Sequence, residues 1–178
     1  MPSWVQAHTG ISPQSGWIYG FTHPINGLDH VLTMVAVGLW AGQTGGRAIW
    51  LMPLTFVFTM ALGGLLGMVT LPFAYAEHGI IFSLLMAGVL IASAIRLPLF
   101  ASTLLIAVFA IGHGYAHGSE MPAGISVPAY AAGFMLATAL LHTAGIGIAL
   151  VIKSSGHSPW LRLSGVVVAL YGGFLFAN

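Results

Sequence analysis

Two kinds of side chain are scarce in this sequence of 178 residues, which has no cysteine and few charged groups. The absence of cysteine excludes a disulfide framework, a thiolate metal site and a thiol nucleophile. Charged residues make up 4% of the chain and hydrophobic residues 58%, whereas an ordinary soluble domain has about 25% charged residues. A soluble fold needs a polar surface that these residues cannot supply. The composition therefore indicates an integral membrane protein.

The few basic residues also exclude some partners and energy sources. Four Lys and Arg side chains scattered along the chain give no electrostatic footprint for nucleic acid. The sequence contains no Walker motif or other nucleotide-binding loop, so ATP is not expected to drive the protein directly. The first basic residue is Arg47, so the positively charged start of a signal peptide is not visible.

Six apolar runs approach or exceed the length of about 20 residues that a helix needs to cross a bilayer. They cover residues 24–42, 48–70, 79–95, 98–117, 128–152 and 159–177. Four of them begin with proline, which the first helical turn tolerates because its N–H has no partner there. The sequence therefore predicts an all-α, polytopic membrane protein, with residues 1–178 forming a single domain of six transmembrane helices.

The charged residues predict the orientation of these spans. All four basic residues fall on one side of the predicted bundle, at Arg47, Arg96, Lys153 and Arg162. The opposite side carries Glu77 and Glu120 and no Lys or Arg. Because cytoplasmic loops are enriched in Lys and Arg, we expect both termini to lie on the non-cytoplasmic side. The expected location is the plasma membrane, which is the inner membrane of a bacterium.

The eight histidines are unusual in so apolar a chain, because lipid cannot satisfy the donor and acceptor of an imidazole. A first constellation, His-Pro-Ile-Asn-Gly-Leu-Asp-His, covers residues 23–30. On a regular helix His23 and His30 would share a stripe but lie two turns apart, too far to bind one ion. Pro24 and Gly27 are residues that can start, kink or loosen a helix between them. Asp29 could accept the second N–H of a histidine.

A second constellation, His-Gly-Tyr-Ala-His-Gly-Ser-Glu, covers residues 113–120. His113, His117 and Glu120 follow one stripe of a helix, and a histidine pair four residues apart can give two ligands to one ion. The predicted topology places both constellations in the outer half of the membrane. Glu77 at the same face and His142, closer to the cytoplasm, are additional candidate ligands.

Imidazole and carboxylate groups without sulfur favour a divalent first-row metal, with Ni²⁺, Co²⁺, Zn²⁺ and Cu²⁺ all admissible. Ligands that follow one another along the membrane normal favour passage of an ion, because conduction needs several moderate sites. We therefore expect a permease and not an enzyme, importing a metal ion from the outer face. The expected partners are the transported ion and the bilayer, and no other cofactor is expected.

Two other functions use the same residue types. An intramembrane hydrolase could hold Zn²⁺ and activate water, although the sequence has neither a His-Glu-x-x-His run nor a Gly-x-Ser-x-Gly elbow. A membrane cytochrome could use His113 or His117 together with His142 as axial haem ligands. The carboxylates would then have no purpose.

With their flanks, the two constellations resemble motifs of the HupE/UreJ family, membrane proteins associated with nickel transport and, in some members, with cobalt. The family pattern His-Pro-x-x-Gly-x-Asp-His occurs at residues 23–30, and His-Gly-x-Ala-His-Gly-x-Glu occurs at residues 113–120. The resemblance spans essentially the whole chain and implies nickel uptake. The functional residues that it implies are His23, Asp29, His30, His117 and Glu120, with Glu77 as a looser match. It does not decide between nickel and cobalt.

Overall fold

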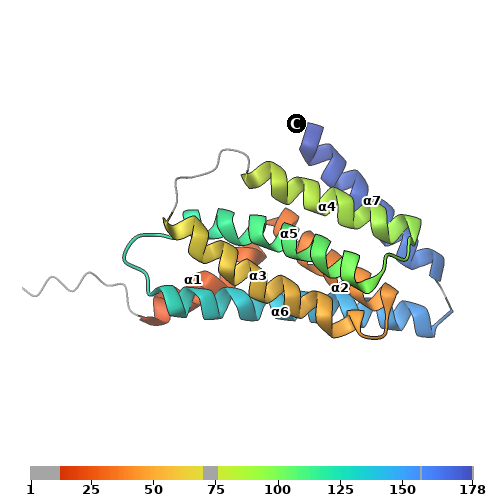
Figure 1. The fold of residues 1–178 in the computed structure, drawn as a ribbon, viewed down its shortest axis with the longest axis horizontal. Coiled ribbons are helices and arrows are strands. Elements are labelled where there is room, and N and C mark those ends of the chain that lie inside the picture. The colour runs from red at the N-terminus through yellow and green to blue at the C-terminus, as the bar shows by residue number, and fades with distance from the viewer. Residues whose placement is uncertain (1–12, 70–75, 157, 178) are drawn as a thin grey trace, which may run out of the picture.

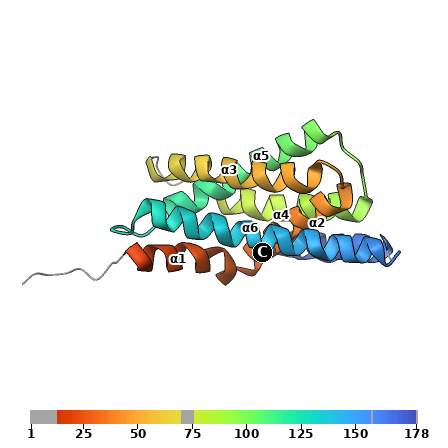
Figure 2. The same cartoon turned by 90° about the horizontal axis from the view of Figure 1, so that it is seen from below.

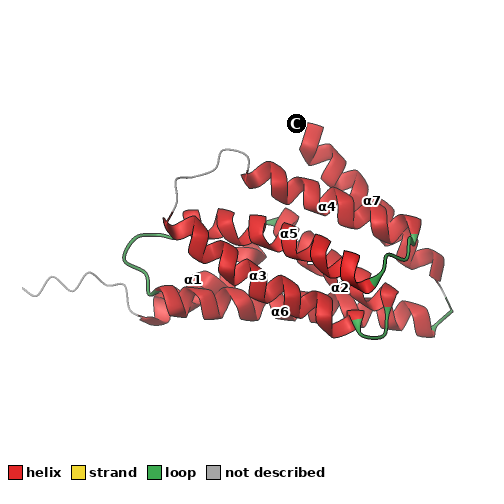
Figure 3. Cartoon of the chain, in the orientation of Figure 1, coloured by secondary structure: helices red, strands yellow, loops and turns green. Residues whose placement is uncertain are grey.

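The computed structural model describes residues 13–69, 76–156 and 158–177, and the regular structure of these residues is entirely helical (Figure 3). This part of the chain forms seven helices: α1 (Pro13–Asn26), α2 (Leu28–Thr44), α3 (Ala48–Val69), α4 (Ala76–Ser93), α5 (Leu99–Ser119), α6 (Val127–Ser154) and α7 (Ser158–Ala177). The prediction of an all-α fold is therefore confirmed.

Most of the predicted spans correspond to one helix each. Four helices, α3, α5, α6 and α7, are long and apolar enough to cross a membrane, and α4 contains a shorter apolar helix at Glu77–Ser93. The predicted boundaries of the second to sixth spans agree with the ends of α3 to α7 to within three residues. The predicted end of the second span at Thr70 lies outside the described residues.

The first predicted span, 24–42, is wrong at its start. Pro24 lies inside α1 and does not begin a helix. Proline cannot donate the backbone hydrogen bond of a helix interior, and α1 ends two residues later at Asn26. Gly27 is extended, with φ −105° and ψ 123°, and α2 begins at the next residue. The segment that the hydropathy pattern marks as one span is therefore parts of two helices.

Most of the helices run close to the long axis of the molecule, with α7 inclined to it, and they pack mainly in pairs (Figure 1). α3 packs along α5, α4 along α7, and α2 along α6. α1 also packs on α6 and lies beside its N-terminal half in Figure 2. The pairing places the ends of α1 and α5 and the start of α2 close to one another, and these are the segments that carry the two histidine constellations.

Glycines allow α3 and α5 to approach closely. A Cβ atom on Gly114 would collide with the carbonyl oxygen of Met60, and one on Gly118 would collide with the carbonyl oxygen of Gly64. Small residues at such contacts are typical of helix pairs in membranes. Because these glycines alternate with His113 and His117 along α5, the contact also fixes where the two imidazoles lie.

The basic residues gather at one end of the bundle, on the right in Figure 1, where α2, α4 and α6 end. Lys153 Nζ donates to the carbonyl oxygens of Gly42 at 3.1 Å and Gln43 at 3.3 Å. Arg162 Nε donates to the carbonyl oxygen of Ala92 at 2.8 Å. These cations lie at the C-terminal ends of α2 and α4, where the unpaired carbonyls carry partial negative charge.

Replacing Gly114 by alanine is expected to destabilise the bundle, and replacing Gly112 is not. The added methyl group at 114 meets backbone atoms of α3, whereas a Cβ at 112 has no atom within 4 Å. Overpacking of this kind costs roughly 1–3 kcal/mol. Thermal unfolding in detergent should therefore show a lower melting temperature for Gly114→Ala and an unchanged one for Gly112→Ala. Equal melting temperatures would contradict the packing described here.

Candidate metal site

An outer group of three ligands forms where the end of α1 meets the end of α5. His23 Nε2 lies 3.0 Å from His117 Nδ1. Oε2 of Glu120 lies 3.7 Å from His23 Nε2 and 3.8 Å from His117 Nδ1. One donor atom from each of the three residues lies within 4.8 Å of the others. This spacing allows one metal ion to contact all three.

An inner group consists of His30, His113 and His117, from the start of α2 and the end of α5. The His117 ring lies 4.6 Å from the His30 ring and 6.5 Å from the His113 ring, measured between centroids. One donor atom from each residue again lies within 4.8 Å of the others. His113 is 1% exposed and His117 is 3% exposed, whereas His30 is half-buried, so two of the three rings are shielded from solvent.

The break at Gly27 brings His23 and His30 to the same place. On one continuous helix they would lie two turns apart, but both rings contact the His117 ring. The distance between ring centroids is 4.8 Å for His23 and 4.6 Å for His30. A Cβ atom on Gly27 would lie 2.7 Å from His30 Nδ1 and 2.8 Å from Asp29 Oδ1. Glycine at this position therefore makes room for the Asp29–His30 pair.

Each histidine of the inner group has a partner for one ring nitrogen only. His30 Nδ1 lies 3.1 Å from Asp29 Oδ1, and His113 Nε2 lies 2.8 Å from Ser83 Oγ. His117 Nδ1 faces the outer group. The remaining nitrogens, His30 Nε2, His113 Nδ1 and His117 Nε2, are buried and have no hydrogen-bond partner among the residues that the structure describes. Buried polar atoms are nearly always paired, so these three nitrogens are the atoms of the inner group that could ligate a metal ion.

The partners of His30 and His113 also determine which nitrogen is free to bind an ion. A carboxylate only accepts hydrogen bonds, so His30 Nδ1 donates to Asp29 and Nε2 keeps its lone pair. Ser83 Oγ donates its single proton to the carbonyl oxygen of Ile80 at 2.7 Å, so it accepts from His113 Nε2. His113 Nδ1 then keeps its lone pair. Partners of this kind orient the imidazoles of metal sites.

The surroundings of the two groups differ in polarity. Glu120 is exposed, and the adjacent His117 ring lowers the pKa of its carboxyl group, which is therefore ionised at neutral pH. His117 also borders a mostly apolar cavity of about 290 Å³ between α3, α5 and α6. The centroid of the Phe134 ring lies 4.6 Å from that of the His117 ring. The outer group therefore carries an exposed negative charge, whereas His117 lies against an apolar interior, where electrostatic attraction is stronger.

The sequence analysis identified every histidine and carboxylate of the two groups, but it missed Ser83. Ser83 is one of two serines in the apolar helix α4, and nothing in the sequence distinguishes it as a partner of a histidine. Glu77, in the first turn of α4, is exposed and belongs to neither group, so its role stays a prediction. His142 is buried in α6 and also lies outside both groups.

Comparison with known proteins agrees with the two motifs. A family model described as HupE / UreJ protein matches residues 1–175. The chain belongs to the HupE/UreJ family. It is also 38% identical to Protein HupE of Rhizobium leguminosarum bv. viciae over 178 residues, which are 100% of this chain and 93% of that protein. No solved structure matches the chain. The family resemblance carried by residues 23–30 and 113–120 is thus confirmed.

Removing the hydroxyl group of Ser83 should weaken metal binding by this HupE/UreJ protein. Loss of a partner that orients a ligand typically lowers metal affinity by about 10–100-fold. Isothermal titration of the purified protein with Ni²⁺ should show this loss for Ser83→Ala and a smaller loss for Ser83→Thr, which keeps the hydroxyl. Ser93→Ala is the control, because Ser93 is exposed on the same helix and its Oγ donates to the Val89 carbonyl oxygen. An unchanged affinity for Ser83→Ala would contradict the role given to Ser83.

Proposed function

We propose that this protein imports a divalent transition-metal ion, with Ni²⁺ the preferred ion and Co²⁺ the next. The observation that carries the proposal is the set of three unpartnered, buried ring nitrogens on His30, His113 and His117. Leaving such atoms without a partner is unfavourable, and a metal ion would satisfy all three together. Imidazole ligands are suited to a borderline divalent ion of this kind. The ion is the cargo of the protein, not its cofactor.

The two groups form consecutive positions on a path entered from the outer face. Glu120, assisted by Glu77, attracts the hydrated cation, which His23, His117 and Glu120 then bind. His117 belongs to both groups: Nδ1 faces the outer one, and Nε2 is the unpartnered nitrogen. The ion can therefore move inward without losing all of its imidazole ligands at once. Asp29 supplies a negative charge next to the inner group.

We further propose six membrane crossings, with both termini outside the cytoplasm. α2 has 17 residues, at the lower end of the lengths that cross a bilayer, and only Gly27 separates it from α1, so we assign the first crossing to α1 and α2 together. α3 to α7 make the other five. The gathering of basic residues at one end of the bundle supports a cytoplasmic location for that end. The protein is then a multi-pass protein of the bacterial inner membrane.

The two alternative functions are less well supported. Three histidines can also hold a catalytic zinc ion, but membership of the HupE/UreJ family favours transport over hydrolysis. A haem between His113 and His142 would displace the Phe56 ring, which lies 5.5 Å from the His113 ring and 5.0 Å from the His142 ring. We therefore keep transport as the function and do not propose an enzyme.

Influx of Ni²⁺, Co²⁺ and Zn²⁺ into proteoliposomes tests the proposal. We expect uptake of Ni²⁺ or Co²⁺ by the unmodified protein and almost none by His30→Ala, which lacks one ligand of the inner group. The matched control is Leu28→Ala, because Leu28 lies in the same helical turn and is 58% exposed. A protein that transports none of these ions but retains one zinc ion tightly would instead support the hydrolase.

A further inference from the structure

One buried histidine has no hydrogen-bond partner for either ring nitrogen. His142 on α6 is fully buried, and within the described part of the chain both its Nδ1 and its Nε2 lack a hydrogen-bond partner. A histidine that only helps helices to pack normally bonds at least one nitrogen to a neighbour. His142 also differs in depth from the inner group, because it lies past the middle of α6 (Val127–Ser154), toward the end of the bundle that carries the basic residues. Its two free nitrogens indicate a ligand position of its own.

An aromatic ring connects His142 to the inner group. Phe56 on α3 is fully buried, and its ring centroid lies 5.5 Å from that of His113 and 5.0 Å from that of His142. The Phe56 and His142 rings meet edge to face, at 84°. Met52 and Met60, one turn before and one turn after Phe56, are buried as well. Phe56 is therefore part of an apolar stripe of α3 that contacts both imidazoles.

An apolar constriction of this kind opposes the passage of an ion. A cation that leaves His113 loses nitrogen ligands and meets a ring that offers none, although the face of an aromatic ring attracts cations weakly. Apolar constrictions are one means by which channels close their pores. Because the Phe56 side chain has no exposed surface, it must rotate or its neighbours must shift before an ion can pass.

We propose that His142 is an inner ion position and that Phe56 is the gate between it and the group of His30, His113 and His117. This inference rests on the proposed function, because it names the step that follows binding at the inner group. In this arrangement, binding of the ion and its release depend on different residues. The three histidines select and hold the ion, and Phe56 with His142 controls its release toward the cytoplasm.

The variant His142→Phe tests the inner position. Phenylalanine keeps an aromatic ring of similar size but removes both nitrogens, so a packing role survives the change and a ligand role does not. We expect Ni²⁺ to bind the purified variant at the group of His30, His113 and His117 with unchanged affinity, while influx falls by about tenfold or more. Influx equal to that of the unmodified protein would overturn the inner position, and so would equal losses of binding and influx.

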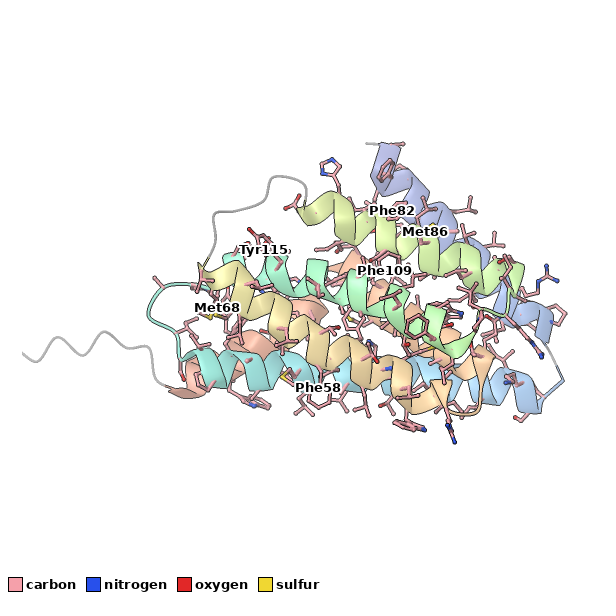
Figure 4. All side chains as sticks on the ribbon, viewed as in Figure 1. Phe58, Met68, Phe82, Met86, Phe109 and Tyr115 are labelled. Carbon is pink, nitrogen blue, oxygen red and sulfur yellow. The ribbon has the colours of Figure 1, made fainter. Side chains whose placement is uncertain are left out.

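The variant Phe56→Leu tests the gate. The smaller side chain lowers the obstruction, so we expect influx to rise by about threefold or more with Ni²⁺ affinity unchanged. Phe58→Leu is the matched control, because Phe58 lies on the same helix and is 62% exposed (Figure 4). If size exclusion shows that Phe56→Leu does not fold, Phe56→Met replaces it, since methionine fills irregular gaps.

The outcomes of these assays separate this inference from the proposed function. If the unmodified protein imports no ion, the proposed function fails and the gate fails with it. If the unmodified protein imports Ni²⁺ but Phe56→Leu shows unchanged or lower influx with intact binding, the gate alone is wrong. A rise in influx for both Phe56→Leu and Phe58→Leu would also overturn it, because the effect would then not depend on the position of the ring.

Discussion

An imidazole that is buried among apolar helices must satisfy two ring nitrogens, and this requirement organises the centre of the protein. One nitrogen of His30 is bonded to Asp29, and one nitrogen of His113 is bonded to Ser83. His117 divides its two nitrogens between the outer and inner groups. What remains is one unpaired nitrogen on each ring of the inner group. These three unpaired nitrogens are the observation on which the proposed metal transport rests.

Close helix packing holds these rings in place. The backbone of α3 touches Gly114 and Gly118 on α5, and the backbone of α2 touches α6 in the same way, where a Cβ on Gly38 would collide with the carbonyl oxygen of His142. Any larger residue at these positions would separate the helices and move the ligands. Gly27 has a different effect, because it ends the regular helix and lets His23 and His30 reach one imidazole. The glycines and the histidines therefore belong to one arrangement.

The sequence predicts the parts of this arrangement that depend on local patterns. Apolar runs locate α3 to α7 because each helix in lipid must satisfy its own backbone hydrogen bonds. The two histidine constellations contain every histidine and carboxylate of the outer and inner groups. The sequence does not predict α1 as a separate helix, because the break at Gly27 follows from local backbone geometry that a hydropathy pattern does not record. Ser83 and Phe56 are ordinary residues of apolar helices. The roles proposed for them depend on the packing of α4 and α3 against His113, so no pattern within either helix indicates them.

X-ray absorption spectroscopy of the purified protein loaded with one equivalent of Ni²⁺ tests the central claim most directly, since it reports how many imidazoles coordinate the ion. The account predicts three imidazole ligands in the unmodified protein and two in His113→Phe, which keeps a ring at this buried position but removes its nitrogens. Coordination by oxygen alone, or the same imidazole count in both proteins, would contradict the assignment of His30, His113 and His117 as the inner group.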